Sequence, residues 1–394
     1  MKNTAYIVKG YRSAVGKAPK GRLRFTRPDV MAAQVIKHLL NQMDGFDPEL
    51  IDDVIVGNAM PEAEQGLNMA RLISLMGLNT VKVPGVTVNR YCASGSESIA
   101  LAVAKIQSGM AKCILAGGAE SMSYIPMGGY KPVPEFDATN NGHSDYYFGM
   151  GLTAEEVANT YGISRKDQDE FALNSHKKAL KAQETNRFAS EIAPITIEEQ
   201  YLDEHQQLKS KTSEFTHDEG PRKNTSIEAL NGLRPVFAQG GSVTAGNSSQ
   251  MSDGAAFVMI MDEETLKKHN LKPWAKLVSY ATVGLEPKIM GMGPAYAVPK
   301  ALEQANLKLE DIGLFELNEA FASQSLAVIR ALNLNPDLVN VNGGAIALGH
   351  PLGCSGTKLT VQLLNEMEKR NVKYGMVTMC VGTGQGAASI FELM

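Results

Sequence analysis

The sequence contains only four cysteines, at positions 92, 113, 354 and 380. Cys92 lies in the stretch NRYCASG, directly before residues with helical spacing, so we expect it just before a helix N-terminus. There the helix dipole and the unpaired N–H groups favour a thiolate. Such help matters for a nucleophile, because a free thiol with a pKa of about 8.5 is only slightly ionised at pH 7. A small buried hydrophobic residue is the alternative interpretation of Cys92.

A second thiol lies at a turn near the C-terminus. Cys380 follows the apolar stretch YGMVTM and precedes VGTGQG. The glycine pattern alone is weak evidence for a dinucleotide site, whereas the thiol suggests a reactive group at the carboxyl edge of a sheet. Cys113 is interpreted as a buried strand residue, and Cys354 receives no role. No CxxC pair or dense cysteine framework occurs, which argues against a zinc site and a disulfide scaffold and indicates a reducing compartment.

Two distant parts of the chain repeat the same order of features. Each has an apolar strand ending in asparagine, a helix, a Ser-Gly turn, a second helix, an apolar strand and a glycine-rich turn. In the first part, Asn58 lies 36 positions before Ser94. In the second part, Asn318 lies 37 positions before Ser355. This order and spacing predict a duplicated βαβ-rich unit.

The duplication predicts that a histidine lies near Cys92. If the two halves pack about a pseudo-twofold axis, the N-termini of their second helices face one another. His350, in GGAIALGHPLGCSG, then comes close to Cys92 and could act as the base for its thiol. The other six histidines lie in polar or helical contexts and are expected to be solvated.

The composition describes a globular α/β protein. Hydrophobic residues make up 44% of the chain and charged residues 20%, and a net charge of −4 gives no reason to expect a nucleic-acid or membrane partner. The N-terminal stretch is typical of a strand rather than a signal peptide. No apolar run approaches the roughly 20 residues that span a bilayer. We therefore expect a cytoplasmic protein.

Alternating strands and helices predict an α/β fold with mixed, mainly parallel sheets covered by helices on both faces. Helical spacing puts apolar residues on one face of each of two helices: Met31, Val35 and Leu39 in one, and Ile99, Val103 and Ile106 in the other. Residues 121–249 have a different character, with two polar helical patterns and then a charged loop, as in an insertion that shapes a binding site. We expect an N-terminal half at 1–120 and 250–272, an inserted loop domain at 121–249, and a C-terminal half at 273–394.

Seven motifs, in this order along nearly the whole chain, carry a family resemblance: VNRYCASG, GGAESMS, LRPVF, TAGNSSQMSDGAA, NEAFA, GGAIALGHPLGCSG and CVGTGQGA. Together they resemble those of the thiolases. The resemblance implies a thiolase-like fold, in which two similar βαβ-type halves form a layered α/β/α/β/α arrangement and carry an inserted loop domain. It also implies assembly as a homodimer or homotetramer.

The resemblance further implies a reaction and a set of roles. A thiolase cleaves a 3-ketoacyl-CoA between C2 and C3 with a second CoA, or runs the reverse Claisen condensation. By resemblance, Cys92 attacks the 3-keto carbon and becomes acylated, His350 takes its proton, and Cys380 protonates the enolate of acetyl-CoA. Two developing oxyanions require two stabilising sites. His350 with a water held by Asn318 would form one, and the backbone N–H groups of Cys92 and Gly382 the other.

Coenzyme A is implied as a co-substrate, with no permanently bound cofactor and no metal. Arg222 is placed near the nucleotide, and Phe237 and Ser249 along the pantetheine. Met150 and Met290 are placed near the reacting acyl group. Without the resemblance, Arg222 would be a charge in a solvated loop and both methionines would be core residues. Enzymes of fatty-acid β-oxidation are the suggested protein partners.

Gly149 favours a degradative 3-ketoacyl-CoA thiolase. Biosynthetic thiolases specific for acetoacetyl-CoA typically carry a histidine before the Met-Gly of the loop domain, whereas this chain has Gly149 there. The glycine removes bulk and would admit longer acyl chains. The biosynthetic acetyl-CoA C-acetyltransferase stays the alternative.

Two other protein classes share such a fold. Decarboxylating condensing enzymes usually pair one cysteine with two histidines, or with histidine and asparagine, so Cys380 and the NEAFA motif favour a thiolase. A non-catalytic lipid or CoA binder is the more remote alternative. Binding alone needs none of Cys92, His350 and Cys380, and all three are intact.

Overall fold

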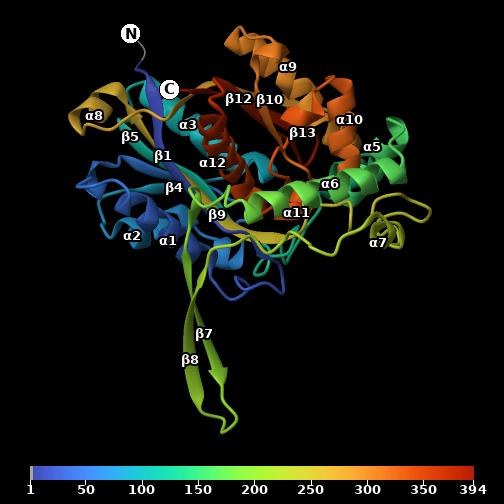
Figure 1. The fold of residues 1–394 in the computed structure, drawn as a ribbon, viewed down its shortest axis with the longest axis horizontal. Helices are drawn as coiled ribbons and strands as arrows, with labels where there is room; N and C mark the ends of the chain where they lie inside the picture. The colour runs from blue at the N-terminus through green and yellow to red at the C-terminus, as the bar shows by residue number, and fades with distance from the viewer. Residues whose placement is uncertain (1–2) are drawn as a thin grey trace.

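One mixed sheet runs through the computed structural model, which describes residues 3–394 (Figure 1). Its strand order is β11-β12-β13-β10-β1-β9-β5-β3-β4, with the short β2 beside β9 and the short β6 beside β1. The strands are Ala5–Ser13 (β1), Gly16–Lys17 (β2), Asp53–Gly57 (β3), Gly85–Val88 (β4), Cys113–Ser121 (β5), Ile192–Ala193 (β6), Ser252–Asp262 (β9), Ala275–Gly284 (β10), Leu314–Leu317 (β11), Tyr374–Val381 (β12) and Gln385–Leu393 (β13).

The sheet consists of two halves that meet at a narrow seam. β1 and β10 share one paired position, Ile7 with Ala275. In the N-terminal half, β3 is parallel to both β4 and β5, and in the C-terminal half β11 is parallel to β12. The strands nearer the seam are antiparallel: β9 pairs with β5 and β1, and β13 pairs with β12 and β10. The parallel pairs need helical crossovers, whereas β12 and β13 are joined by a tight turn.

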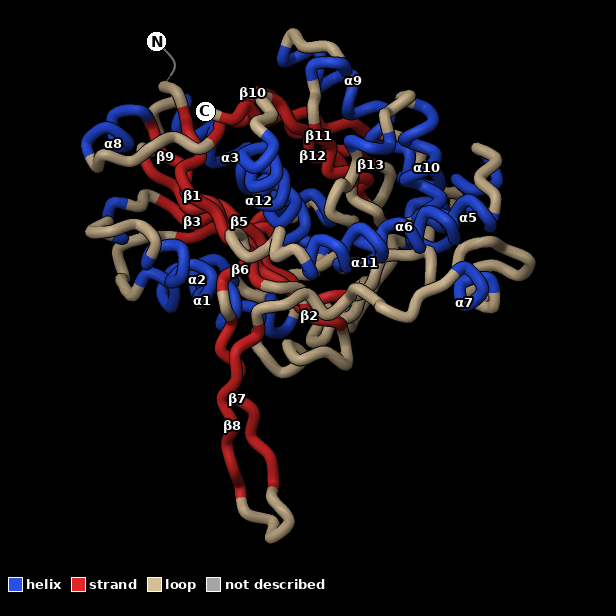
Figure 2. The backbone as a smooth tube through the Cα atoms, viewed as in Figure 1, coloured by secondary structure: helices blue, strands red, loops and turns tan. Residues whose placement is uncertain are grey.

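Helices cover both faces of each half-sheet (Figures 1 and 2). They are Pro28–Asn41 (α1), Met69–Leu78 (α2), Ser94–Gln107 (α3), Phe136–Asn140 (α4), Met150–Thr160 (α5), Arg165–Glu184 (α6), Ile227–Asn231 (α7), Glu263–Lys268 (α8), Gly293–Ala305 (α9), Ala322–Ala331 (α10), Ala345–Leu348 (α11) and Leu352–Arg370 (α12). Within residues 3–394, no helix is both long and apolar enough to cross a membrane.

Three hydrophobic cores show the layered arrangement that the sequence predicts. The first lies between α1, α2 and the N-terminal strands and contains the predicted α1 face, Met31, Val35 and Leu39. The second holds α3 and α12 between the two half-sheets and contains the predicted α3 face, Ile99, Val103 and Ile106. The third joins α9 and α10 to the outer face of the C-terminal strands. The α/β/α/β/α layering and both predicted helix faces are therefore confirmed.

The N-terminal turns of α3 and α12 cross with their backbones almost in contact. A Cβ atom on Gly356 of α12 would lie 2.3 Å from the backbone nitrogen of Ser96 in α3. A Cβ atom on Gly95 would lie 2.7 Å from the backbone nitrogen of Thr357. Only glycine permits such an approach. The Ser-Gly turns of the two repeated units therefore meet at the centre of the molecule.

The region between the halves contains an element that the sequence analysis missed. The two predicted polar helices are present as α5 and α6. The expected charged loop instead includes a β-hairpin, Ile195–Leu202 (β7) and Leu208–Phe215 (β8), which projects from the body (Figure 1). Only its base alternates buried and exposed residues clearly, and the exposed outer part resembles a loop in composition. The domain boundaries expected near residues 120, 249 and 272 stay a prediction.

Candidate active site

Cys92 lies where the sequence predicts, in the short 3-10 helix Tyr91–Ala93 that leads into α3. Tyr91 has a φ of 45°, a left-handed conformation that is uncommon for a residue other than glycine. The sulfur is close to the backbone N–H groups of Cys92 itself and of Gly382. These two donors are the pair that the sequence analysis assigned to one oxyanion site.

At the Cys92 sulfur, the effect of burial opposes that of the helix N-terminus. Burial raises the pKa of the Cys92 thiol to about 12, although the two backbone N–H groups act in the opposite direction. Removal of the sulfur from water disfavours its charged form more than the helix N-terminus favours it. Cys92 is therefore a thiol at pH 7 and needs a base before it can attack.

His350 lies in the tight connection between α11 and α12. Its backbone N–H is held by the carbonyl oxygen of Gln250 and by Oγ of Ser252, each at 3.1 Å. Burial lowers the pKa of His350 to about 3, and the positive charge of Lys358 acts in the same direction. The imidazole is therefore neutral at pH 7, which is the state in which it can accept a proton.

Hydrogen bonds define the tautomer of His350. Oγ of Ser355 lies 2.9 Å from the carbonyl oxygen of Pro351, to which its only proton is donated. The same Oγ lies 2.5 Å from Nδ1 of His350; with its proton on Pro351 it accepts that bond, and we assign the imidazole proton to Nδ1. Nε2 is then the unprotonated nitrogen, and its lone pair faces the amide of Asn318. The nitrogen that can act as a base is thus the one on the side of Asn318, whose Nδ2 is 3.3 Å from Nε2.

Asn318 directly follows β11 and is almost fully buried. Its backbone N–H donates to the carbonyl oxygen of Thr378 in β12 at 3.0 Å. The asparagine is therefore fixed to the strand that carries Cys380. The structure thus brings the amide donor of Asn318 and the base nitrogen of His350 side by side, as one polar wall of the candidate site.

Cys380 lies at the carboxyl end of β12 and is fully buried. It packs in an apolar cluster with Met290, Phe321 and the partly buried Met150. Burial raises the pKa of Cys380 further above its ordinary value, and the neighbouring Cys92 acts in the same direction. Cys380 is thus a protonated thiol close to Cys92, which suits a proton donor.

The turn after β12 completes the site on the side of Cys92. A Cβ atom on Gly382 would lie 3.6 Å from the ring of Tyr91 and 3.8 Å from the sulfur of Met150. The predicted residues Gly382, Met150 and Met290 are therefore brought to the two thiols. Gly149, which precedes α5, faces open space, since a Cβ atom there would meet nothing within 4 Å.

The residues expected along the pantetheine lie next to this cluster. Phe237 stacks edge-on against Phe321 with ring centroids 6.1 Å apart. The backbone N–H of Ser249 donates to the carbonyl oxygen of Ala320 at 2.9 Å. Both residues thus contact the segment that follows Asn318, so the structure brings them to the candidate site.

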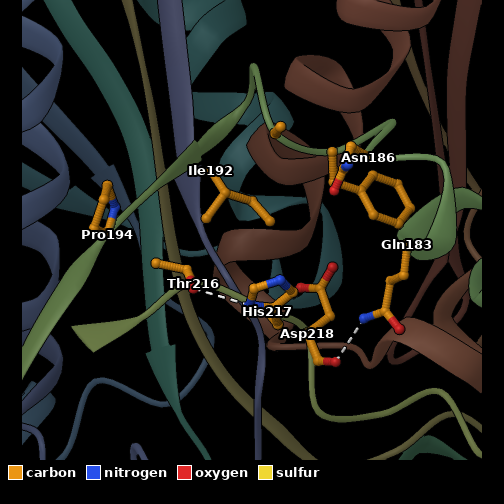
Figure 3. Close-up of a pocket in the computed structure, with 9 residues that line it drawn as sticks. Gln183, Asn186, Ile192, Pro194, Thr216, His217 and Asp218 are labelled. Carbon is orange, nitrogen blue, oxygen red and sulfur yellow. Dashed lines mark hydrogen bonds between the residues drawn. The ribbon is translucent and has the colours of Figure 1, made fainter. Parts of the chain in front are cut away.

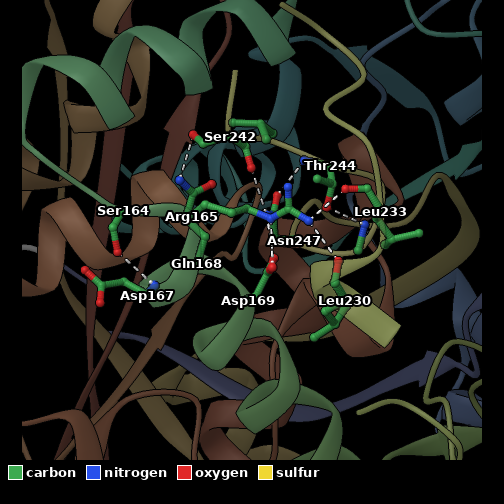
Figure 4. Close-up of polar contacts among 12 residues, drawn as sticks. Ser164, Arg165, Asp167, Gln168, Asp169, Leu230, Leu233, Ser242, Thr244 and Asn247 are labelled. Atoms are coloured by element: carbon green, nitrogen blue, oxygen red, sulfur yellow. Dashed lines mark hydrogen bonds and ion pairs between the residues drawn. The ribbon is translucent and has the colours of Figure 1, made fainter. Parts of the chain in front are cut away.

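A buried polar network fixes the loop before Ser249 (Figure 4). Nε of Arg165 contacts the Asp169 carboxylate at 2.7 Å, and Nδ2 of Asn247 donates to the same carboxylate at 3.0 Å. The carbonyl oxygen of Asn247 accepts the N–H of Ala322 at 2.9 Å. The start of α6 therefore holds this loop against the NEAFA segment.

Arg222 is the one expected residue for which no direct contact with this cluster is found. Its side chain is exposed, and its backbone N–H donates to Nδ1 of His176 at 3.2 Å. The expectation that His176 is solvated is wrong, because it lies on the buried face of α6. Burial lowers the pKa of His176 to about 4, with Arg222 and Lys17 acting in the same direction. Arg222 of the inserted region therefore lies near a second positive charge, Lys17 of the N-terminal half.

Two further features bear on other kinds of site. A hollow of about 250 Å³ lies at the base of the β7–β8 hairpin, lined by residues such as Ile192, Thr216 and His217 (Figure 3). It contains none of the expected site residues. Over residues 3–394, no group of three or more histidine, cysteine, aspartate or glutamate side chains is arranged to hold a metal ion.

Three residues of the site were missed by the sequence analysis: Tyr91, Glu120 and Ser355. Each lies inside a motif quoted for the resemblance. Ser355 follows His350 by five residues in the turn that begins α12, and that spacing could have suggested its bond to the imidazole. The carboxylate of Glu120 accepts bonds from segments distant in sequence, which no local pattern reveals.

Comparisons with known proteins agree with this geometry. The family description "Thiolase, N-terminal domain" matches residues 5–264, and "Thiolase, C-terminal domain" matches residues 271–393. The chain is 51% identical over 389 residues to a 3-ketoacyl-CoA thiolase of Bacillus subtilis, with 99% of each chain covered. It is 42% identical to the peroxisomal 3-ketoacyl-CoA thiolase A of Mus musculus, covering 98% of this chain and 90% of that one.

A solved structure shows the same fold. The crystal structure of the Bacillus anthracis acetyl-CoA acetyltransferase superposes with a TM-score of 0.89 at 38% identity, covering 100% of this chain and 99% of that one. Two family matches that span almost the whole chain, high identity over its full length and the shared architecture lead to one conclusion. The chain belongs to the thiolase family.

Proposed function

We propose that this thiolase cleaves 3-ketoacyl-CoA with a second CoA, giving acetyl-CoA and an acyl-CoA shortened by two carbons. The observation that carries the proposal is a group of three side chains at the meeting point of the two halves: the partly buried thiol of Cys92, the buried thiol of Cys380 and the neutral imidazole of His350. The names of the Bacillus subtilis and Mus musculus relatives support the substrate class.

In the first half-reaction, the thiol of Cys92 adds to the 3-keto carbon while Nε2 of His350 takes its proton. The tetrahedral adduct collapses with cleavage of the C2–C3 bond, and the bonding electrons move to C2. Cys380 donates its proton to that carbon, which releases acetyl-CoA and leaves an acyl group on Cys92. The raised pKa of Cys380 and the lowered pKa of His350 support these opposite roles, since one group starts protonated and the other starts neutral.

In the second half-reaction, the Cys380 thiolate takes the proton of an incoming CoA thiol. The CoA sulfur attacks the acyl carbon, and the adduct collapses with departure of Cys92. The imidazolium of His350 returns the proton to the leaving sulfur. All three groups then have their starting protonation states, so the cycle balances.

Two groups of donors stabilise the developing oxyanions in this proposal. The backbone N–H groups of Cys92 and Gly382 face one oxygen, and both are close to the Cys92 sulfur. His350 faces the other together with a water held by Asn318, whose Nδ2 lies 3.3 Å from Nε2. Such preorganised donors are commonly the largest single contribution to this kind of catalysis.

The CoA moiety is proposed to cross the inserted region, with Arg222 near the nucleotide and Phe237 and Ser249 along the pantetheine. Met150 and Met290 would contact the acyl end. Glycine rather than a bulkier residue at position 149 supports acceptance of acyl chains longer than four carbons. We accordingly assign the enzyme to fatty-acid β-oxidation in the cytoplasm, with no permanently bound cofactor. We assign it to a homodimer or homotetramer that can associate with other β-oxidation enzymes. The Bacillus anthracis structure, named an acetyl-CoA acetyltransferase, supports biosynthetic acetoacetyl-CoA formation as the second candidate.

A chain-length series tests the substrate assignment. The purified protein is assayed for CoA-dependent loss of 3-ketoacyl-CoA absorbance, with acetoacetyl-CoA and with 3-ketoacyl chains of 6 to 16 carbons. We expect the longer substrates to be cleaved at least as efficiently as acetoacetyl-CoA. A sharp preference for acetoacetyl-CoA, with chains of eight carbons and longer inert, supports the biosynthetic candidate. No CoA-dependent cleavage at any length indicates a binding protein.

A further inference from the structure

Glu120 is a fully buried carboxylate beside the proposed active site to which the proposed reaction assigns no step. It lies near the carboxyl end of β5, in the GGAES stretch. Its Oε2 accepts the backbone N–H groups of Ala59 and Gly353, each at 2.8 Å. Its Oε1 accepts the side-chain amides of Gln65 at 2.7 Å and Asn58 at 3.2 Å. Four donors from three separate segments thus converge on one side chain.

One of these donors belongs to the other half of the molecule. Gly353 is in the first turn of α12, three residues after His350 and two before Ser355. The approach is close: a Cβ atom on Gly353 would lie 2.6 Å from Cα of Asn58 and 2.8 Å from Oε2 of Glu120. Glu120 therefore spans the boundary between the β3–β5 edge and the helix whose first turn orients the imidazole.

The charge of Glu120 does not assist the nucleophile. Its negative charge acts to raise the pKa of Cys92, which opposes formation of the thiolate. Burial also raises the pKa of Glu120 itself, and within residues 3–394 no basic side chain forms an ion pair with it. A buried carboxylate that has no ionic partner and opposes ionisation of the neighbouring Cys92 needs another reason to be there. The four donors and the N-terminus of α12 supply the stabilisation that its position requires.

We propose that Glu120 is a positioning residue for the reaction. Its carboxylate fixes the first turn of α12 to the β3–β5 edge, and so holds the imidazole of His350 at a fixed position relative to the Cys92 sulfur of the other half. This inference rests on the proposed role of His350 as the base. The hydrogen bonds of Glu120 would affect the rate by keeping the imidazole in position. A displacement of about 1 Å in a reacting group can reduce a rate about 100-fold.

Two substitutions separate the position of the carboxylate from its charge. Glu120→Gln keeps the size of the side chain but replaces one acceptor oxygen by an NH2 group, which then faces either two backbone N–H groups or two amides. Glu120→Asp keeps the charge but is one methylene shorter, so it cannot reach Ala59 and Gly353 while also reaching Gln65. A positioning role predicts that both variants are impaired. A purely electrostatic role predicts that Glu120→Asp resembles the wild type and that Glu120→Gln forms the Cys92 thiolate more readily.

The measurement is steady-state thiolysis of acetoacetyl-CoA, with the thermal unfolding temperature recorded for each variant. We expect kcat to fall about 10- to 100-fold in both Glu120 variants while KM for CoA changes less than threefold. The control is Glu366→Gln, which removes a second buried carboxylate farther along α12, where it binds Arg187 and Asn342. It should lower the unfolding temperature and leave kcat within twofold of the wild type.

Several outcomes would overturn the inference. Wild-type kcat in either Glu120 variant does so, as does an equal loss of kcat in Glu366→Gln, which would indicate general destabilisation. If neither Glu120 variant folds, Gln65→Met is the milder probe, and an unchanged kcat there assigns Glu120 a structural role only. His350→Ala is measured in parallel: an active His350→Ala enzyme contradicts the proposed function itself, whereas an inactive one beside fully active Glu120 variants contradicts this inference alone.

Discussion

Ser355→Ala removes the group that orients the proposed base, but it deletes none of the reacting groups of Cys92, His350 and Cys380. In the wild type, Oγ of Ser355 accepts the Nδ1–H of His350 at 2.5 Å and donates to the carbonyl oxygen of Pro351. Alanine at this position cannot accept that bond. The imidazole can then rotate or adopt the other tautomer, in which Nε2 carries the proton and cannot take one from Cys92.

The size of the effect follows from the burial of the pair. His350 and Ser355 are both at most 4% exposed, so no solvent replaces the lost acceptor. A buried donor left without a partner costs about 1–3 kcal/mol. If that stabilisation is lost in the reacting geometry, kcat falls about 5- to 150-fold, because about 1.4 kcal/mol corresponds to a factor of ten. Affinity for CoA should change little, since neither atom faces the nucleotide in the proposed arrangement.

Thr360→Val is the matched control for this experiment. Thr360 is on the same helix, is fully buried, and its Oγ1 donates to the carbonyl oxygen of Gly356 at 2.8 Å, one turn before it. Both variants lose a buried hydroxyl of α12, but only Ser355→Ala loses a contact with the imidazole. CoA-dependent thiolysis is measured for both, with KM and kcat separated. Equal kcat values for the two variants would refute the assigned tautomer and the role of Ser355.

Three other changes have defined outcomes. Asn318→Ala should lower kcat by up to about 100-fold with KM for CoA almost unchanged, and unchanged kcat with a large rise in KM would make Asn318 a binding residue instead. Gly356→Ala places a methyl carbon 2.3 Å from the backbone nitrogen of Ser96. Thermal unfolding should therefore show a loss of stability of about 1–3 kcal/mol or more. An unchanged unfolding temperature would contradict the close crossing of α3 and α12. The pKa of His350 is about 3 in the folded enzyme against 6.5 in the unfolded chain, so the unfolded chain binds the extra proton and stability falls as the pH drops below about 6.5. In denaturant unfolding from pH 7 to pH 4, the wild type should therefore lose stability more steeply than His350→Gln, by up to about 1.4 kcal/mol per pH unit. Parallel curves for the two proteins would contradict the buried neutral imidazole.

The parts of the fold that depend on local pattern could be predicted from the sequence. The apolar faces of α1 and α3 follow from residues three and four apart, and the duplicated order of strand, helix and Ser-Gly turn indicated that two helix N-termini meet. The placement of Cys92 before a helix needed only the small residues that follow it. The β7–β8 hairpin was not predictable in the same way, because most of it faces solvent and carries no buried alternation.

The electrostatic state of the site depends on contacts that a linear pattern does not contain. Cys92 has the helix N-terminus that the sequence predicted, but desolvation of the sulfur by the surrounding protein dominates its pKa. The bonds of Glu120 come from residues about 60 positions earlier and more than 230 positions later in the chain. Such long-range donors become visible only once the chain is folded.

The most direct test of the roles assigned to Cys92 and Cys380 is to locate the acyl group after incubation of the free enzyme with acetyl-CoA. Intact-protein mass spectrometry with peptide mapping reads the label in the wild type, in Cys92→Ser and in Cys380→Ser. We expect an acetyl group on Cys92 in the wild type, none in Cys92→Ser, and a residual label on Cys92 in Cys380→Ser even though full turnover collapses. An acetyl group on Cys380 that forms at the wild-type rate in Cys92→Ser would contradict the assignment of the two thiols.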